Sequence, residues 1–247
     1  MDIKLNKDER IDDLGLKGLK IIQNSKWFCF GIDSVLLSDF SKNIKKDARV
    51  IDLGTGTGII SILLCGKTEL KNIVGVDIQE NVCEMANRSI LLNELQNRAK
   101  IVCDNITNMR NRYDTCSFDV VVTNPPYKKN NTGIKNEEKQ KEISRHEIYA
   151  DLDDFLKTAF YLLKDKGEFY MVHRPERLVD VMNCMRKNKI EPKTIRFVFS
   201  NVNKAPVLFL IKGIKNAKSF LEIMPNLYIY DNDGLYTEEI KKIYGNV

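Results

Sequence analysis

Residues that bind metals are scarce in this sequence. It has two histidines, and none of its six cysteines is spaced as a CxxC or CxxxC pair. Because metal ligands must cluster, no metal site is expected. Four of the cysteines lie in or beside apolar runs, where a cysteine acts as a small hydrophobic residue. Disulfides are not expected either, since we expect a reducing compartment.

Long apolar runs are also missing. The longest, residues 59–65 and 207–211, are far shorter than the ~18 residues that a membrane-crossing helix needs. The first ten residues are rich in charged side chains and no apolar segment follows them, which argues against a secretory signal. The 247 residues are 43% hydrophobic and 30% charged, a composition typical of a soluble globular protein. We therefore expect a cytoplasmic protein without membrane contacts.

One stretch has almost no acidic residues, although the net charge of the chain is only +5. Residues 183–218 hold nine basic residues and a single acid, Glu191. Such asymmetry is typical of a protein that binds a polyanion, but a solvated lysine-rich surface explains it equally well. The nine basic residues are Arg186, Lys187, Lys189, Lys193, Arg196, Lys204, Lys212, Lys215 and Lys218.

Strand-like and helix-like segments alternate through the middle of the chain. Apolar strands are predicted at 49–53, 72–77, 100–103, 118–123 and 168–173, and helices at 59–65, 79–95, 152–163 and 175–187. A closing hairpin is predicted from 194–200 and 206–212. This alternation is typical of an α/β fold, an open and mostly parallel sheet with helices on both faces.

The chain shows no internal repeat and no Pro/Ser-rich linker, so we expect a single domain over residues 1–247. Residues 49–218 form its core, with an N-terminal extension at 1–48 and a C-terminal extension at 219–247. The polar segment 128–147 has no periodicity and follows the fourth strand directly. It is expected to be a long mobile loop at the mouth of the sheet.

A glycine-rich turn, RVIDLGTGTG at residues 49–58, is the first chemical signal. Its glycines allow a sharp turn and close approach to a ligand, and the helix that follows presents free N–H groups. Asp77 ends the next strand, 25 residues after Asp52, where a carboxylate can accept both hydroxyls of a ribose. Asp104 ends the third strand, where it can accept an adenine amino group or simply cap the following turn.

The tetrapeptide Asn124-Pro125-Pro126-Tyr127 follows the fourth strand. Its two prolines fix the backbone and carry no N–H donors, so carbonyl oxygens remain available. The Asn124 side-chain oxygen and the Pro125 carbonyl can accept the two N–H bonds of a planar amino group, while the Tyr127 ring can stack on a base. Holding the amine in this way raises its reactivity by geometry, without a strong general base.

Together these motifs resemble class I S-adenosylmethionine-dependent methyltransferases that modify exocyclic or amide nitrogen. The resemblance implies a Rossmann-like fold with a seven-stranded, mostly parallel sheet, S-adenosylmethionine as cofactor, and catalysis by residues 124–127. Asp52, Gly54 and Gly56 would lie along its methionine part, Asp77 on its ribose and Asp104 on its adenine. The full cofactor set that it implies is Asp52, Gly54, Thr55, Gly56, Gly58, Asp77, Ile78, Asp104, Asn105 and Asn124.

The outer segments are similar to a bacterial family that methylates N6 of the adenine 3′ of the anticodon in valine tRNA. The similarity rests on residues 8–23, 28–40, 145–147 and on VHRPERL at 172–178. It implies a tRNA partner whose base is splayed out of its stack before reaction. The substrate contacts it implies are Phe30, Arg145, His146, Arg174 and Lys204. Phe28 and Phe30 can instead be hydrophobic packing residues. Arg174 can instead form an ion pair with Asp180 or Glu176.

Other functions fit parts of the same pattern. A glutamine-N5 methyltransferase of release factors shares NPPY, but carries a helical domain where this chain has 51 residues before Asp52. Base methyltransferases of ribosomal RNA share the core, whereas a DNA adenine methyltransferase needs a recognition domain for which there is no room. A non-catalytic RNA-binding module on the same fold is the alternative from another class. A monomer is favoured.

Overall fold

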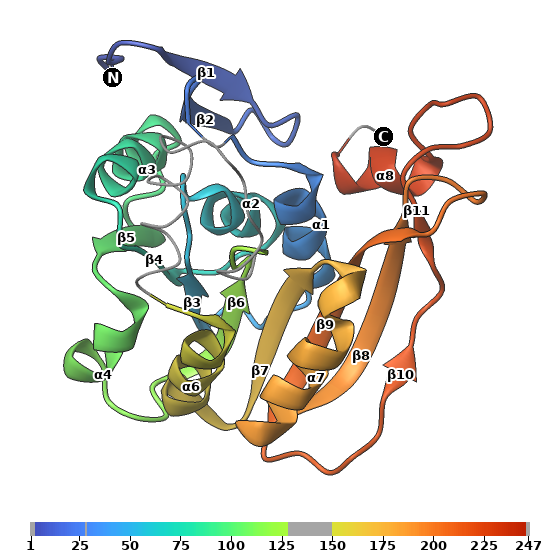
Figure 1. Cartoon of the computed structure of the whole chain (residues 1–247). Helices are drawn as coiled ribbons and strands as arrows, with labels where there is room; N and C mark the ends of the chain where they lie inside the picture. Colours follow the sequence, from blue (N-terminus) through green and yellow to red (C-terminus); the bar gives the residue numbers. More distant parts are fainter. Residues whose placement is uncertain (1–2, 28, 128–149, 246–247) are drawn as a thin grey trace, which may run out of the picture.

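The computed structural model describes residues 3–27, 29–127 and 150–245. The predicted mobile loop at 128–147, which includes Arg145 and His146, lies outside the described residues, as does Phe28. Figure 1 shows a twisted central sheet covered by helices on both sides. No helix in the described part of the chain is long and apolar enough to cross a membrane.

Nine strands form the main sheet, in the order β10-β8-β9-β7-β6-β3-β4-β5, with β11 also paired to β8. The strands β3 to β7 run parallel, and β9 is antiparallel to both β7 and β8. Seven long strands were predicted, and the two-residue strands β10 and β11 extend that number. The strands are β3 (Arg49–Leu53), β4 (Asn72–Asp77), β5 (Ala99–Cys103), β6 (Phe118–Thr123), β7 (Leu163–His173), β8 (Ile190–Phe199), β9 (Pro206–Lys215), β10 (Glu222–Ile223) and β11 (Leu227–Tyr228).

Helices cover both faces of this sheet because its central strands are apolar on both sides. In β6, Val120 and Val122 pack into one core cluster and Val121 into the other. The helices α1 (Ile32–Phe40), α2 (Ile59–Lys67) and α3 (Glu80–Leu92) contribute to the first cluster. The second cluster contains side chains of η1 (Ile106–Asn108), α4 (Met109–Arg112), α6 (Leu152–Leu162) and α7 (Leu178–Lys187). The short turn η2 (Pro175–Arg177) leads into α7.

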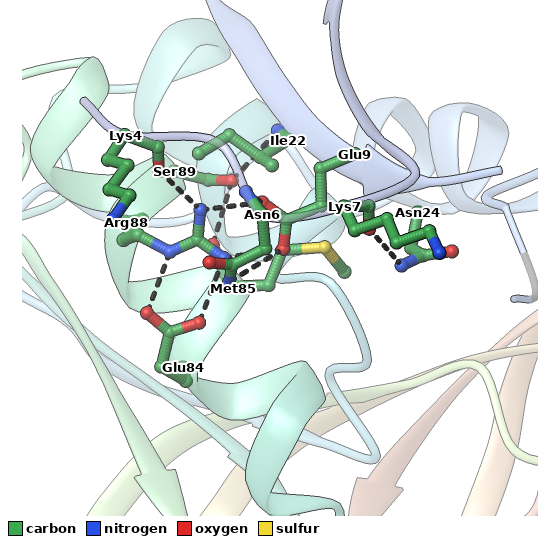
Figure 2. A network of polar contacts seen from close by, with 10 residues as sticks. All are labelled: Lys4, Asn6, Lys7, Glu9, Ile22, Asn24, Glu84, Met85, Arg88 and Ser89. Atoms are coloured by element: carbon green, nitrogen blue, oxygen red, sulfur yellow. Dashed lines mark hydrogen bonds and ion pairs between the residues drawn. The ribbon is translucent and has the colours of Figure 1, made fainter. Parts of the chain in front are cut away.

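The N-terminal hairpin is fastened to α3. Its strands β1 (Glu9–Asp13) and β2 (Lys20–Asn24) pair antiparallel. Figure 2 shows Arg88 of α3 reaching both Glu9 and Glu84, with nitrogen to oxygen distances of 2.6 and 2.7 Å, and the carbonyl of Lys4 at 3.0 Å. The N–H of Ile22 donates to Ser89 Oγ at 2.9 Å. These contacts hold the hairpin against the helix that follows Asp77.

The C-terminal extension adds to the core. Its helix α8 (Glu238–Ile243) buries Ile240 and Ile243, spaced three residues apart on one face, in the first core cluster. Lys67 donates from Nζ to the Ile243 carbonyl. The segment was predicted as an extension without a recognised motif, and in the structure its last helix packs beside α1 and α2.

Most element boundaries agree with the prediction. The strands at 49–53, 72–77 and 118–123 are confirmed at both ends, and the antiparallel hairpin of β8 and β9 is present but longer than predicted. The strand predicted to begin at 168 begins instead at Leu163. The first residues of this strand are irregular, because Lys166 has φ +59° and the pairing register with β6 shifts there. Helix α6 accordingly ends at Leu162, one residue before its predicted end.

Candidate active site

The carboxyl ends of the parallel strands bring the predicted acidic residues to one edge of the sheet. Asp52 lies at the end of β3, Asp77 closes β4 and Asp104 follows β5 directly. The N–H groups of Gly54 and Thr55 both donate to the carbonyl of Val76 at 2.9 Å. The glycine-rich turn is thereby tied to the neighbouring strand. This edge, beside the turn from β3 into α2, is where open α/β sheets bind ligands.

Gly56 is a half-buried residue of that turn. Its φ is +54°, and a Cβ added there would meet no atom within 4 Å. Its N–H donates to Asp77 Oδ2 at 2.9 Å, and the other carboxylate oxygen accepts from the N–H of Gln79 at 3.1 Å. The structure therefore keeps open space above Gly56 and holds the Asp77 carboxylate next to it.

Asp52 is fully buried below the turn. One carboxylate oxygen accepts hydrogen bonds from the hydroxyls of Thr55 and Ser61 at 2.6 and 3.2 Å. The other, Oδ1, has no hydrogen-bond partner among the described residues. Burial raises the pKa of Asp52 to about 7, the two hydroxyls oppose the shift, and the charge of Asp77 adds to it.

Asn105 is the N-cap of the turn after β5, and Asp104 directly precedes it. Asp104 accepts from the backbone N–H of Asn105 at 2.8 Å, from Asn108 at 2.9 Å and from Arg112 at 2.5 Å. The hydrogen bonds from Asn108 and Arg112 lower the pKa of this carboxyl. The Asn105 side chain accepts from the N–H and hydroxyl of Thr107. The N-cap of this turn is thus Asn105 and not Asp104, and contacts of Asp104, Asn105 and Ile78 with a cofactor remain predictions.

The NPPY tetrapeptide begins directly after β6. Pro125 is buried and Pro126 exposed. The amide nitrogen of Asn124 lies 3.1 Å from Ser34 Oγ, and its amide oxygen lies 2.8 Å from the Tyr127 hydroxyl. The same hydroxyl lies 2.6 Å from Oδ2 of Asp33. Burial, and then the charge of Asp33, raises the pKa of Tyr127 well above its usual range.

Sequence analysis assigned no functional role to Asp33 or Ser34. Both are buried in the first turn of α1, and the structure brings them against Asn124 and Tyr127, about ninety residues further along the chain. The available signal was an acidic residue, Asp33, at the start of the segment that forms α1. That position is common for solvent-exposed helix caps, so it did not indicate a site.

The Tyr127 ring lies between two residues of the VHRPERL segment. The His173 ring centroid is 5.1 Å from that of Tyr127, and the Arg174 guanidinium carbon lies 5.3 Å from the Tyr127 centroid. His173 is buried, its Nδ1 accepts from the N–H of Arg174, and burial lowers its pKa to about 4. It is therefore neutral at pH 7, and forms part of the wall beside Tyr127.

The predicted substrate contacts are scattered around this edge. Arg174 is beside Tyr127, whereas the ion pair with Asp180 is made by Arg177 at 2.8 Å. Phe30 packs partly buried against the first core cluster, and its N–H donates to Gln23. Lys204 is exposed in the turn between β8 and β9, which the strand directions place at the same edge as Asn124. Among the described residues, no hydrogen bond, ion pair or ring contact joins Phe30 or Lys204 to the tetrapeptide.

Much of the basic stretch is engaged within the protein. Lys215 is buried, and its Nζ donates to the carbonyls of Phe160 and Leu163 at 2.7 Å. Four more of the nine make ion pairs, which are Arg186–Glu191, Lys187–Asp153, Arg196–Glu239 and Lys212–Glu168. The interpretation of all nine as one polyanion-binding surface is therefore wrong for Lys215 and weakened for the four residues that make ion pairs.

A family model described as the methyltransferase small domain matches residues 31–189 of the chain. The chain belongs to the methyltransferase small domain family. The match begins at Gly31, so it includes α1, which the sequence prediction assigned to an extension. It also spans the glycine-rich turn and the NPPY tetrapeptide.

Solved structures support the methyltransferase fold. A predicted O-methyltransferase from Agrobacterium tumefaciens superposes with a TM-score of 0.70 over 87% of this chain and 96% of its own, at 16% identity. A geranyl diphosphate C-methyltransferase from Streptomyces coelicolor, solved with S-adenosyl-L-homocysteine, has a TM-score of 0.55 over 74% and 76% of the two chains, at 13% identity. The fold is thus the Rossmann-like fold of class I methyltransferases, as predicted.

Several relatives carry the name tRNA1(Val) (adenine(37)-N6)-methyltransferase. The one from Haemophilus influenzae is 25% identical over 90% of this chain and 92% of its own length. The one from Pedobacter heparinus is 26% identical over 85% and 86% of the two chains. The relative from Bacteroides fragilis is 27% identical over 142 residues, so this chain spans 58% of its length.

S-adenosylmethionine is the cofactor expected for a methyltransferase of this fold, and two features of the site fit it. Space is open above Gly56, and the unpaired Asp52 oxygen is a buried acceptor beside the turn. Asp77 stands where a carboxylate can bind ribose hydroxyls. When bound, S-adenosylmethionine supplies an electrophilic methyl group on a sulfonium. Gly54, Gly56 and Asp77 are the residues expected to hold it.

Proposed function

We propose that this methyltransferase modifies N6 of an adenine in tRNA, the base 3′ of the anticodon in valine tRNA. The observation that carries the proposal is the position of Asn124-Pro125-Pro126-Tyr127, directly after β6 and beside the cofactor edge. The names of relatives that align with 85% and 90% of the chain support tRNA as the substrate.

In the proposed reaction the protein orients the amine, and the one proton that the methylated nitrogen must lose passes to water and not to a protein base. The Asn124 amide oxygen and the Pro125 carbonyl accept the two N–H bonds of the exocyclic amino group. Its lone pair then points away from these acceptors, toward the methyl donor. The Nδ1 atom of neutral His173 already accepts a backbone hydrogen bond, so this residue is not available to accept a proton from the amine.

Arg174 and Lys204 are the proposed phosphate contacts. Arg174 stacks on Tyr127 and donates from Nη1 to the Val207 carbonyl at 3.3 Å, which places its charge at the rim of the target pocket. Lys204 lies in an exposed turn of the same edge. Cations at these positions can hold the backbone of a splayed nucleotide, as single-stranded RNA recognition requires.

The test offers labelled S-adenosylmethionine together with unmodified tRNA, ribosomal RNA or release factor protein as parallel acceptors. Digestion to nucleosides is expected to show N6-methyladenosine from tRNA alone. Asn124→Ala is expected to abolish this product while leaving cofactor affinity nearly unchanged, and Asp77→Ala is expected to weaken cofactor binding. Label in the protein acceptor would make the target a glutamine. Cofactor binding with no labelled acceptor would favour a non-catalytic RNA-binding module.

A further inference from the structure

The Tyr127 hydroxyl faces two acceptors but carries one hydrogen. Its oxygen lies 2.6 Å from Oδ2 of Asp33 and 2.8 Å from Oδ1 of Asn124. A carboxylate and an amide carbonyl are both acceptors, so only one of them can receive the hydrogen at a time. Hydrogen bonds to a charged acceptor are shorter and stronger than those to a neutral one. The hydrogen therefore belongs to the Asp33 contact.

The Asn124 amide is held in one orientation on its other side. Its Nδ2 lies 3.1 Å from Ser34 Oγ, a buried hydroxyl that accepts this N–H. The amide oxygen then stays on the side of Tyr127, 2.8 Å from an oxygen whose hydrogen points elsewhere, and only an added N–H donor relieves the repulsion between the two oxygens. An acceptor that has no donor of its own is ready to receive the N–H of an incoming group.

The fold fixes the Asp33 carboxylate for this contact. Its Oδ1 accepts from the N–H of Ser34 at 2.9 Å, and the side chain is buried. Gly31 leaves room for it, because a Cβ at that residue would lie only 2.9 Å from Oδ1. The carboxylate is thus held at the start of α1 with its second oxygen directed at Tyr127.

We propose that Asp33 is a positioning residue that keeps Asn124 Oδ1 available for the target amine. It does so by taking the hydrogen of the Tyr127 hydroxyl, which would otherwise occupy that oxygen. Ser34 completes the arrangement by binding the amide nitrogen. This inference rests on the proposed function, in which an amino group is the methyl acceptor.

Asp33→Asn is the sharpest variant, because it preserves shape and changes one acceptor into a donor. Its side-chain NH2 can donate to the Tyr127 oxygen and turn the tyrosine hydrogen toward Asn124. We expect kcat with tRNA to fall about tenfold or more, while KM for tRNA and the Kd for S-adenosylmethionine change by less than about twofold. A wild-type kcat in this variant would overturn the proposal.

Adding Tyr127→Phe to Asp33→Asn tests the direction of the effect. The second change removes the hydroxyl that now occupies Asn124, so kcat is expected to rise about tenfold above that of Asp33→Asn alone. A merely structural role of Asp33 predicts no such recovery. A double variant no faster than Asp33→Asn contradicts the proposed hydrogen assignment.

Ser34→Ala tests the same proposal if Asp33→Asn fails to fold, as judged by thermal melting. It removes only the acceptor of the Asn124 N–H, and is expected to lower kcat severalfold without weakening cofactor binding. An unchanged kcat overturns the proposal. Failure of the proposed function looks different, because the wild-type protein itself then forms no N6-methyladenosine in tRNA.

Discussion

The backbone N–H of Gly56 donates to Oδ2 of Asp77 at 2.9 Å, so the glycine-rich turn and the end of the neighbouring strand form one unit. The bond links residues 21 positions apart in the sequence and lies beside the open space above Gly56. The turn is therefore shaped before any ligand arrives. Pre-formed geometry of this kind reduces the ordering that binding requires.

Gly56→Ala is expected to weaken cofactor binding far more than it destabilises the protein. The methyl group meets no atom of the chain, so the loss of stability is limited to the strain of a left-handed alanine, about 1 kcal/mol. The same methyl group enters the space expected for the cofactor, and we expect its Kd to rise about tenfold or more.

Gly234→Ala is the matched control for this experiment. Gly234 also has a positive φ, +78°, and an added Cβ there meets nothing within 4 Å, but it lies in the C-terminal extension. Calorimetric titration of S-adenosylmethionine should give the wild-type Kd for this variant. Equal Kd values for the two alanine variants would contradict the placement of the cofactor above Gly56.

Asp52→Asn is expected to change how stability depends on pH. The pKa of Asp52 is about 7 in the folded protein because of burial, and an unfolded aspartate titrates near ~3.9. The folded state therefore binds the extra proton between these values, and the contribution of Asp52 to stability falls as pH rises from about 4 to about 7.

Asparagine cannot titrate, so the variant escapes this loss. Its unfolding free energy relative to wild type should increase from pH 4.5 to pH 8, with about 4 kcal/mol as the upper bound. Denaturant unfolding of the cofactor-free proteins across this range measures the difference. Parallel pH profiles for the two proteins would show that the carboxylate is ionised throughout.

Lys215→Met is expected to destabilise the protein by about 2–4 kcal/mol, since two buried carbonyls lose a charged donor. Lys204→Met, in an exposed turn, should leave stability within about 0.5 kcal/mol and weaken binding of tRNA. Urea unfolding and tRNA titration separate the two effects. Equal stability of both variants would contradict the structural role of Lys215.

Arg88→Met is expected to loosen the N-terminal hairpin. The partner Glu9 has a side chain only 3% exposed, so loss of the guanidinium leaves a buried charge without its partner and costs about 3 kcal/mol. Hydrogen exchange in β1 and β2 should accelerate. Lys241→Met removes an equally short pair, 2.6 Å to the exposed Glu238, and should leave stability nearly unchanged because water screens exposed ion pairs. Unchanged exchange in Arg88→Met would show that other contacts hold the hairpin.

The sequence predicted the central strands well because each is a short apolar run bounded by polar residues. Val120, Val121 and Val122 are buried on both faces, and no alternative element accommodates such a run of β-branched residues. The turn and the tetrapeptide were found because each chemistry needs particular residues close together in the chain. The predicted fold class followed from these two kinds of local signal.

Contacts between distant segments were not predictable in the same way. Asp33 and Tyr127 are 94 positions apart, and nothing in the local sequence shows that they meet. A lysine such as Lys215 is expected on the surface from its residue type alone. It is buried because β9 packs against the end of α6. Strands of two residues, such as β10, are too short to show a period.

Two valine tRNA transcripts that differ only in the base 3′ of the anticodon, adenine in one and guanine in the other, test the proposed site of methylation. Each is incubated with the protein and labelled S-adenosylmethionine, and the products are digested to nucleosides. We predict N6-methyladenosine from the adenine transcript and no label from the other. Equal labelling of both transcripts, or label in neither, would contradict the proposed site of methylation.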